Sequence, residues 1–348
     1  MQMSYTVKLL PSEHSFKVED GQRILAAGLA AGNFMPYSCR QGVCNTCKGR
    51  IVSGTVDYGD VHPAYFSEAD RNSGFALLCQ ASPISDCVIE VKELEGLAGV
   101  RRKVVPCRIT DLTPLAPDVF LMRVRLPMNE NMMFVAGQFV EFMLKDGIRR
   151  SYSITIPPSV EGVRTLEFHI RHLPGGKFTD RLFAGEVKVG EVMRFEGPDG
   201  SFYLRDSNKP AILLASGTGF GPIKAMLEHA VKRPDPRHMT LYWGGRSKRD
   251  LYMFDLAQGW ERQFPSFHFV PVLSEPDIED NWTGRNGLVH QGVMEDFPDL
   301  SGHQVYACGA PIVVESARGD FSSHCALPSD EFFADSFITE AETHGVQS

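Results

Sequence analysis

Four cysteines in the first quarter of the chain have a spacing that suits the binding of iron and sulfide. Cys39, Cys44 and Cys47 follow the pattern C-x4-C-x2-C, and Cys79 stands alone further on. This spacing is typical of the four thiolate ligands of a two-iron, two-sulfur cluster. Gly42 lets the loop fold tightly, so that backbone N–H groups can point at the negatively charged sulfur atoms. Zinc is the alternative, but zinc ribbons usually carry two C-x2-C pairs and only Cys44 and Cys47 form one here, so the spacing favours the cluster.

A cluster of this kind moves one electron at a time, whereas a nicotinamide delivers two electrons together as a hydride. A flavin is the usual mediator between the two. If the protein draws on a nicotinamide, we therefore expect a flavin site and a nicotinamide site further along the chain.

Residues 150 to 153 carry groups that suit a flavin. The run Arg150-Ser151-Tyr152-Ser153 resembles the R-x-Y-S motif of the ferredoxin reductase superfamily, whose members bind flavin with it. The Arg150 guanidinium can hold a phosphate, the Tyr152 ring can lie along the isoalloxazine, and the Ser153 hydroxyl can bond a ring heteroatom. The alternative is an ordinary strand with an exposed arginine, so a second element is needed in support.

That second element is a glycine turn followed by a helix. The run from Gly175 to Thr179 resembles the second flavin element of the same superfamily. Backbone N–H groups at the start of the helix and the Thr179 hydroxyl would hold the pyrophosphate. The resemblance also implies that the preceding strand faces the flavin with its backbone. The further FAD-binding residues that it implies are His169, Ile170, Gly175, Gly176, Lys177 and Thr179.

A glycine loop between a predicted strand and a predicted helix suits a nucleotide. The apolar run 211–215 fits a strand buried on both faces, and Gly217, Gly219 and Gly221 follow it, with Pro222 in the first helical turn. Glycines here let a pyrophosphate approach the backbone at the helix N-terminus. The form G-T-G-x-x-P resembles the one that the ferredoxin reductase superfamily uses for its nicotinamide nucleotide. The implied contacts are Gly217, Thr218 and Gly219.

Arg246 and Asp250 follow the next predicted strand, in the region that meets the adenosine ribose in this superfamily. An acidic residue disfavours a 2′-phosphate, whereas an arginine favours it. Asp250 lies among Arg246, Lys248 and Arg249. The resemblance to NADH-using reductases with a similar run favours NADH.

Cys308 is the residue that we expect beside the nicotinamide ring. The run Cys308-Gly309-Ala310-Pro311 resembles the C-G-x-P motif of the superfamily and follows a predicted strand. A buried core thiol is the alternative for Cys308, but a strand end opposite the glycine loop favours a site residue. Phe337, near the end of the chain, resembles the closing aromatic residue of the family, which stacks on the flavin; core packing is the alternative.

The first ninety residues have the element pattern of a small mixed fold. Alternating apolar and polar residues predict a two-strand hairpin, and an Ala- and Leu-rich helix ends at Gly32. With the cysteine loop, this order resembles the β-grasp ferredoxin. The predicted strands are 4–10, 14–19, 49–53 and 88–92, and the predicted helices are 23–31 and 67–71.

The remaining residues form two further patterns. Short strands separated by Gly and Pro turns predict a small antiparallel barrel, and strands alternating with helices from Lys209 onward predict a Rossmann-like sheet. The barrel strands are 104–111, 119–126, 138–144, 151–156, 165–170 and 192–195. The later strands are 211–215, 239–243, 267–272 and 305–307, with helices at 223–231, 288–295 and 312–318. On a strand, His169 and His172 would point to opposite faces, so we do not expect them to share a metal.

The composition narrows the class of protein. A chain of 348 residues predicts two or three domains, and the net charge of -8 argues against a nucleic-acid partner. Because there is no run of about 18 apolar residues and no signal-peptide pattern at the start, we expect a cytoplasmic protein without a membrane partner. We expect Cys87, Cys107 and Cys325 to be buried apolar residues.

Together these features predict an α+β β-grasp ferredoxin, an antiparallel β-barrel flavin domain and an α/β Rossmann-like nicotinamide domain. The predicted bounds are 1–93 for the ferredoxin domain with its 2Fe-2S cluster, 94–103 for a linker, 104–206 for the FAD barrel, 207–340 for the NAD domain and 341–348 for a tail.

This order resembles the NADH-dependent reductases of bacterial oxygenases and the CDP-6-deoxy-glucoseen reductase group. The resemblance implies that hydride passes from NADH to FAD, and that single electrons pass through the cluster to a terminal oxygenase. One alternative is a reductase that serves a deoxysugar dehydrase. Another is an iron–sulfur sensor with vestigial flavin and nicotinamide sites, against which the intact glycines and Arg150 count.

Overall fold

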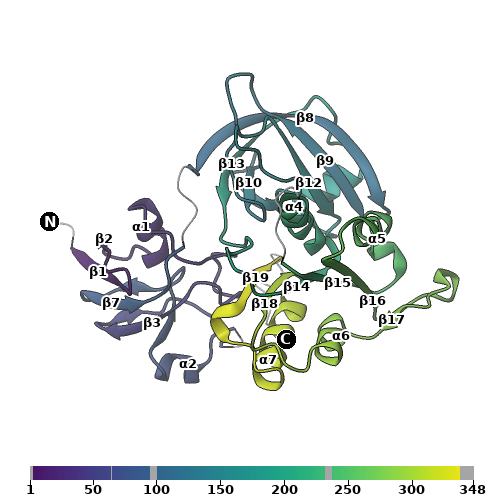
Figure 1. Cartoon of the computed structure of the whole chain (residues 1–348). Coiled ribbons are helices and arrows are strands. Elements are labelled where there is room, and N and C mark those ends of the chain that lie inside the picture. Colours follow the sequence, from purple (N-terminus) through teal and green to yellow (C-terminus); the bar gives the residue numbers. More distant parts are fainter. Residues whose placement is uncertain (1–2, 64, 95–99, 232–236, 338–348) are drawn as a thin grey trace. The chain divides into compact units, whose positions relative to one another are not determined.

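The computed structural model describes residues 3–63, 65–94, 100–231 and 237–337, and they form two compact units. Of the described residues, the first unit contains 3–63, 65–94 and 334–337, and the second contains 100–231 and 237–333; the elements are labelled in Figure 1. Positions 95–99 of the predicted linker and the predicted tail at 341–348 lie outside the described residues.

The first unit is built on a five-stranded sheet in the order β2-β1-β7-β3-β5. The predicted hairpin is confirmed, since β1 and β2 pair antiparallel and bury Val7, Leu9, Phe16 and Val18 on one face. Strand β7 pairs parallel with β1. The strands are β1 (Ser4–Leu10), β2 (Ser15–Glu19), β3 (Lys48–Ser53), β5 (Phe75–Leu77) and β7 (Cys87–Glu90), with the small pair β4 (Val56–Asp57) and β6 (Ser82–Pro83). The helices are α1 (Ile24–Ala30) and α2 (Glu68–Asn72).

The second unit begins with a six-stranded antiparallel sheet in the order β11-β10-β13-β8-β9-β12. Its two end strands meet where the N–H of Thr155, just after β11, donates to the carbonyl oxygen of Glu167 in β12 (2.9 Å), as a barrel requires. Edge-to-face contacts of Phe142 with Phe168 and Phe195 fill its core. The strands are β8 (Lys103–Ala116), β9 (Val119–Arg125), β10 (Phe139–Met143), β11 (Arg149–Ser153), β12 (Thr165–Arg171) and β13 (Val192–Asp199). Helix α3 (Lys177–Phe183) follows β12.

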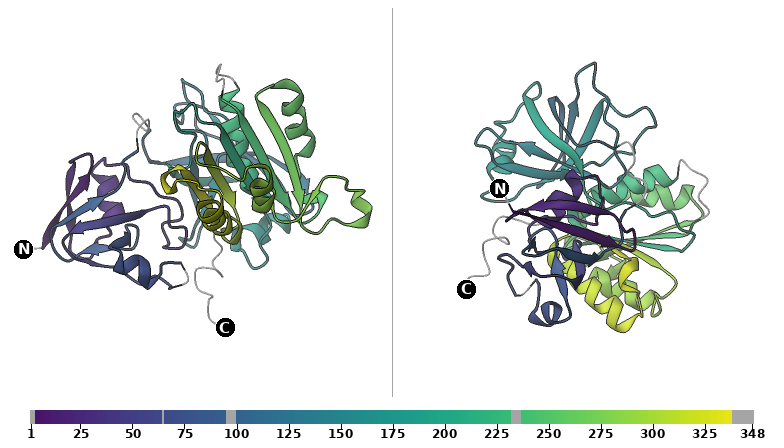
Figure 2. Two further views of the ribbon diagram at one scale, coloured as in Figure 1. Left: turned by 60° about the horizontal axis from the view of Figure 1, so that its bottom comes forward. Right: turned by 90° about the vertical axis from the view of Figure 1, so that its left-hand side faces the viewer.

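The other sheet has the order β17-β16-β15-β14-β18-β19; its first five strands belong to the later part of the second unit, which ends within β19, at Phe333. Helices α4 and α5 lie on one face of this sheet, and α6 and α7 lie on the other (Figures 1 and 2). The strands are β14 (Ala211–Ser216), β15 (Met239–Gly245), β16 (Phe267–Leu273), β17 (Arg285–Asn286), β18 (Gln304–Gly309) and β19 (Phe332–Ser336). The helices are α4 (Phe220–Ala230), α5 (Phe254–Gln263), α6 (Val289–Asp296) and α7 (Pro311–His324).

Some element bounds differ from the sequence predictions. Helix α4 begins at Phe220, three residues before the predicted start, because Pro222 is tolerated within a first helical turn. Helix α5 was not predicted, since it buries only Ala257 and Trp260 and contains Gly259. No described helix is long and apolar enough to span a membrane. Cys87, Cys107 and Cys325 are buried, as predicted.

Candidate functional site

The four predicted cluster cysteines lie together in the first unit. Cys39, Cys44 and Cys47 come from the loop between α1 and β3, and Cys79 follows β5. The N–H of Leu78 donates to the carbonyl oxygen of Cys47 (3.1 Å), which fixes the distant cysteine beside the loop. Cys44, Cys47 and Cys79 are buried, and Cys39 is partly exposed.

The thiols interact in two pairs. A hydrogen bond from Cys39 lowers the pKa of the Cys44 thiol to about 5, and a hydrogen bond from Cys47 lowers the pKa of Cys79. The backbone N–H of Gln41 points at the sulfur of Cys39 (3.3 Å). Across the described ranges, no group of three or more His, Cys, Asp or Glu side chains is arranged to hold a single metal ion. Each iron of a two-iron, two-sulfur cluster takes two cysteine ligands, so two neighbouring pairs of cysteine side chains fit that group.

The tight turn of the cysteine loop depends on Gly42. This residue has a φ of +78°, and a Cβ atom there would lie 2.9 Å from the side chain of Gln80. The Gln80 amide in turn donates to the carbonyl oxygen of Arg40 (2.9 Å). A larger residue at position 42 would therefore displace the side chain that holds the loop.

The predicted flavin residues come from two neighbouring elements of the barrel. Arg150, Tyr152 and Ser153 lie on β11. The centroid of the Tyr152 ring lies 6.0 Å from that of Phe142 and 5.8 Å from that of Phe178 in α3. Burial raises the pKa of Tyr152, so its hydroxyl stays protonated. The structure thus brings the R-x-Y-S strand and the glycine-turn helix together, as one flavin site requires.

The turn before α3 is held by Thr179 itself. The Thr179 hydroxyl donates to the carbonyl oxygen of Leu173 (3.0 Å) and accepts from its N–H (3.2 Å). A Cβ atom on Gly176 would lie 2.4 Å from this hydroxyl, so only glycine fits there. Thr179 therefore shapes the turn that presents Gly175 and Lys177, both of which are exposed. Its predicted contact with the pyrophosphate stays a prediction.

The glycine loop and Cys308 meet at the carboxyl ends of two neighbouring parallel strands. Residue Ala215 of β14 is paired with Cys308 of β18. The loop forms a short 3-10 helix, Gly217–Gly219, and a Cβ atom on Gly219 would lie 2.1 Å from the carbonyl oxygen of Cys308. Open α/β sheets bind their ligands in a crevice at this edge. The predicted nicotinamide residues are therefore brought together where a nucleotide would bind.

Asp250 lies at the same edge, but its carboxylate is already engaged. It accepts hydrogen bonds from the backbone N–H groups of Arg246 (2.8 Å) and Ser247 (3.2 Å). Arg171 of β12 donates to its other oxygen (3.2 Å). Asp250 is buried, whereas the Arg246 side chain is exposed. The carboxylate thus closes a turn, and its predicted contact with the ribose stays a prediction.

Each of the three parts of the chain matches a known protein family. Residues 7–83 match a 2Fe-2S iron-sulfur cluster binding domain, residues 106–203 an oxidoreductase FAD-binding domain, and residues 213–319 an oxidoreductase NAD-binding domain. The chain is also 37% identical over 336 residues to CDP-6-deoxy-L-threo-D-glycero-4-hexulose-3-dehydrase reductase from Yersinia pestis, covering 97% of this chain and 99% of that one. The chain belongs to the ferredoxin reductase family of iron–sulfur flavoproteins.

Further relatives of this reductase are similar over the same length. It is 34% identical to reductase component 2 of terephthalate 1,2-dioxygenase from Comamonas, covering 98% of this chain and 100% of that one. The crystal structure of the cytochrome P450 reductase GcoB from Amycolatopsis matches with a TM-score of 0.76 and 31% identity, covering 96% of this chain and 99% of that one. The predicted fold class and the predicted 2Fe-2S, FAD and NAD modules are therefore confirmed.

For three of the residues predicted to bind the flavin, the geometry of this reductase does not test the predicted contact. The side chain of Ile170 is buried in the barrel core, and that of His169 turns toward Tyr252 of the nucleotide-binding part (3.0 Å). Their predicted role is a backbone contact with the flavin. Phe337 is partly buried and belongs to the first unit. The flavin contacts of all three stay predictions.

A buried ionic cluster around Glu167 was not predicted from the sequence. The Glu167 carboxylate accepts hydrogen bonds from Thr155 (3.1 Å) and Arg123 (3.0 Å) and lies 3.5 Å from the ammonium of Lys224. Burial alone would raise the pKa of Glu167, but the His169 ring, the charge of Lys224 and the hydrogen bond from Arg123 together lower it to about 2. A polar residue at every second position of β12 was the signal that could have revealed this cluster.

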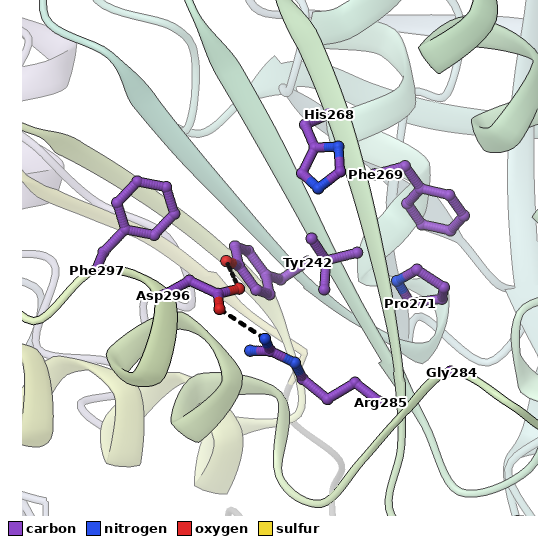
Figure 3. A pocket seen from close by; sticks show the side chains of 9 residues that line it. Tyr242, His268, Phe269, Pro271, Gly284, Arg285, Asp296 and Phe297 are labelled. Carbon is purple, nitrogen blue, oxygen red and sulfur yellow. Dashed lines mark hydrogen bonds and ion pairs between the residues drawn. The ribbon is translucent and has the colours of Figure 1, made fainter.

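A pocket of about 430 Å³ opens on the α6 side of the parallel sheet (Figure 3). At its centre the Tyr242 hydroxyl donates to Asp296 (2.6 Å), and Arg285 donates to the other oxygen of the same carboxylate (2.6 Å). These three groups therefore satisfy one another. The lining residues are Tyr242, His268, Phe269, Val270, Pro271, Gly284, Arg285, Asp296 and Phe297.

Proposed function

We propose that this reductase takes hydride from NADH and supplies single electrons to a partner oxygenase. The observation that carries the proposal is the presence of cluster, flavin and nicotinamide modules in one chain that matches reductase components over nearly its whole length. One such relative is named as the reductase component of a terephthalate dioxygenase. The electron acceptor of this chain would then be a terminal oxygenase.

Different parts of the chain would bind the flavin, the nucleotide and the cluster. When bound, the flavin accepts electrons in pairs and releases them one at a time, and the cluster carries them singly. Arg150 and the turn at Gly175–Gly176 would hold the phosphates of FAD. Gly217 and Gly219 would admit the nucleotide pyrophosphate, and Cys308 would pack beside the nicotinamide ring. The cluster would be held by Cys39, Cys44, Cys47 and Cys79.

We also propose NADH rather than NADPH as the donor. The support is the resemblance of the run around Arg246 and Asp250 to that of NADH-using reductases. Because the Asp250 carboxylate is engaged and the Arg246 side chain is exposed, the test must measure both nucleotides. A lower Kd for NADPH than for NADH would contradict this part of the proposal.

A deoxysugar dehydrase is the second candidate for the electron acceptor. It is favoured by the identity of 37% to a dehydrase reductase, against 34% to the dioxygenase component. The two candidates share every step inside the chain and differ only in the acceptor. Mixing the reduced protein with a terminal oxygenase in one reaction and a dehydrase in another would separate them.

An anaerobic titration with NADH tests the internal route. We expect the flavin absorption to bleach and a paramagnetic signal from the reduced cluster to follow. The variant Cys79→Ser removes one cluster ligand, and we expect it to lose reduction of cytochrome c while NADH still bleaches the flavin. Undiminished cytochrome c reduction in a cluster-free variant would show that the route is wrong. Absence of flavin bands in the wild-type protein would instead favour an iron–sulfur sensor.

A further inference from the structure

One face of strand β12 carries three polar residues that all reach the nucleotide-binding part of the second unit. Alternate residues of a strand share a face, so this row is continuous. The opposite face carries Leu166, Phe168 and Ile170, which fill the barrel core. The contacts of the polar row are Glu167 with Lys224 (3.5 Å), His169 with Tyr252 (3.0 Å) and Arg171 with Asp250 (3.2 Å).

A series of aromatic contacts connects Tyr252, the partner of His169, to the glycine loop. The Tyr252 ring meets Trp243 edge-on, with centroids 5.3 Å apart, and Trp243 stacks on Phe220 at 3.9 Å. The indole N–H of Trp243 donates to the carbonyl oxygen of Gly217 (3.0 Å). Trp243 and Phe220 are fully buried, so this packing has little freedom to adjust. A shift of Tyr252 would therefore move Trp243 and, through its hydrogen bond, Gly217, the first residue of the loop.

The direction of the hydrogen bond follows from the surroundings of His169. Burial lowers the pKa of His169, so its ring is neutral at pH 7. Its Nε2 lies 3.4 Å from a Glu167 oxygen, which favours the tautomer with the proton on Nε2. Nδ1 is then the acceptor, and the Tyr252 hydroxyl donates to it. Burial of that hydroxyl raises the pKa of Tyr252 and keeps the donor protonated, although the ring is partly exposed.

Helix α4 packs against the same part of the barrel. A Cβ atom on Gly221 would lie 2.8 Å from the Thr155 methyl group and 3.6 Å from Nδ1 of His169. One turn later, the Lys224 ammonium donates to the carbonyl oxygen of Thr155 (2.9 Å). The helix that follows the glycine loop is thus held to the barrel on the side where His169 meets Tyr252.

We propose that the hydrogen bond between Tyr252 and His169 is a positioning contact for the nicotinamide nucleotide. It transmits the position of the flavin-side strand β12 through Trp243 to Gly217, and so sets the shape of the glycine loop. Neither residue needs to touch the nucleotide with the polar atoms of this contact, because Nδ1 of His169 and the Tyr252 hydroxyl are engaged with each other. The inference rests on the proposed nucleotide site at Gly217–Gly219.

The variant Tyr252→Phe removes the hydroxyl and keeps the ring. Its matched control is Tyr242→Phe, because Tyr242 is a buried tyrosine of β15, next to Trp243, whose hydroxyl bonds Asp296 at the pocket (Figure 3). The flavin-loaded full-length protein is titrated with NAD⁺ by isothermal titration calorimetry. Because a buried acceptor loses its donor, we expect Tyr252→Phe to weaken NAD⁺ binding by about tenfold. We expect Tyr242→Phe to bind NAD⁺ as the wild type does.

Rapid kinetics separates positioning from general loosening of the fold. A positioning role predicts a higher apparent Kd for NADH in Tyr252→Phe, with a limiting rate of flavin reduction within about twofold of the wild type. Equal NAD⁺ affinity in Tyr252→Phe and the wild type would overturn the proposal, as would an equal loss in both tyrosine variants. Failure of the wild-type protein to bind NAD⁺ would instead overturn the nucleotide site itself.

The variant His169→Leu tests the same bond from its other end. If the bond is the transmitting contact, the affinity of His169→Leu for NAD⁺ should fall about as far as that of Tyr252→Phe. The double variant should then show no further loss, because the bond is already absent in each single variant. Additive losses would overturn the proposal.

Discussion

The buried ammonium of Lys224 allows the clearest test of how the second unit is held together. Its Nζ lies 2.9 Å from the carbonyl oxygen of Thr155, 3.1 Å from Glu228 and 3.5 Å from Glu167, and the residue is 7% exposed. The substitution Lys224→Met keeps much of the aliphatic stem and removes the charge. Glu167 would then be left in the interior with Arg123 as its remaining cationic partner.

The expected loss follows from the state of Glu167. Lowering its pKa from 4.5 to about 2 corresponds to roughly 3 kcal/mol of folded-state stabilisation at neutral pH, shared among its partners. Lys224 is one of these partners and also satisfies the Thr155 carbonyl, whose loss adds about 1 kcal/mol. We therefore expect Lys224→Met to cost about 2–3 kcal/mol, which for a unit of this size lowers Tm by about 5–10 °C.

The rise in FAD fluorescence on heating the loaded protein measures this change. The matched control is Lys209→Met, because the Lys209 ammonium pairs with Glu331 at 2.6 Å but is 43% exposed. A solvent-exposed pair contributes less than about 1 kcal/mol, so we expect the control to lower Tm by no more than about 3 °C. If the two variants lowered Tm equally, the reasoning that burial gives Lys224 its larger effect would be refuted.

Three further predictions use the same structure. The substitution Gly219→Ala would place a methyl group 2.1 Å from the carbonyl oxygen of Cys308, so we expect loss of NAD⁺ binding by calorimetry with flavin absorption retained; undiminished binding would contradict this. Since the folded-state pKa of Glu167 is lowered to about 2, its stabilisation is present above pH 4.5 and lost as the pH falls toward 2. The Tm difference between the wild type and Glu167→Gln, measured by circular dichroism, should therefore be constant from pH 6 to pH 8 and shrink below about pH 4.5; a difference that widened in acid would refute it. We expect Gly176→Ala to lower the FAD content, measured by visible absorption, because a Cβ atom there would lie 2.4 Å from the Thr179 hydroxyl; full occupancy would contradict this.

The sequence alone determined the features whose chemistry depends on residue type at a fixed spacing. The cysteine pattern, the R-x-Y-S strand and the glycine loop each need particular residues close together along the chain. Such local demands predicted the three modules in their order, because neighbours in sequence are also neighbours in space. The strand and helix periods likewise predicted most elements to within a few residues.

Only the tertiary structure decided which distant side chains meet, and this changed how several residues are understood. The sequence predicted Asp250 as a ribose contact, and the structure adds that its carboxylate closes a turn and bonds Arg171 of the barrel. Nothing in the local sequence distinguishes Lys224 from a solvated charge on a helix, but it lies buried beside Glu167. Partners that lie scores of residues apart have no common local pattern, since their pairing depends on how the barrel and the parallel sheet pack. The sequence therefore determined which cofactor modules the chain carries, and the packing of the second unit determined how its flavin-side strand meets its nucleotide loop.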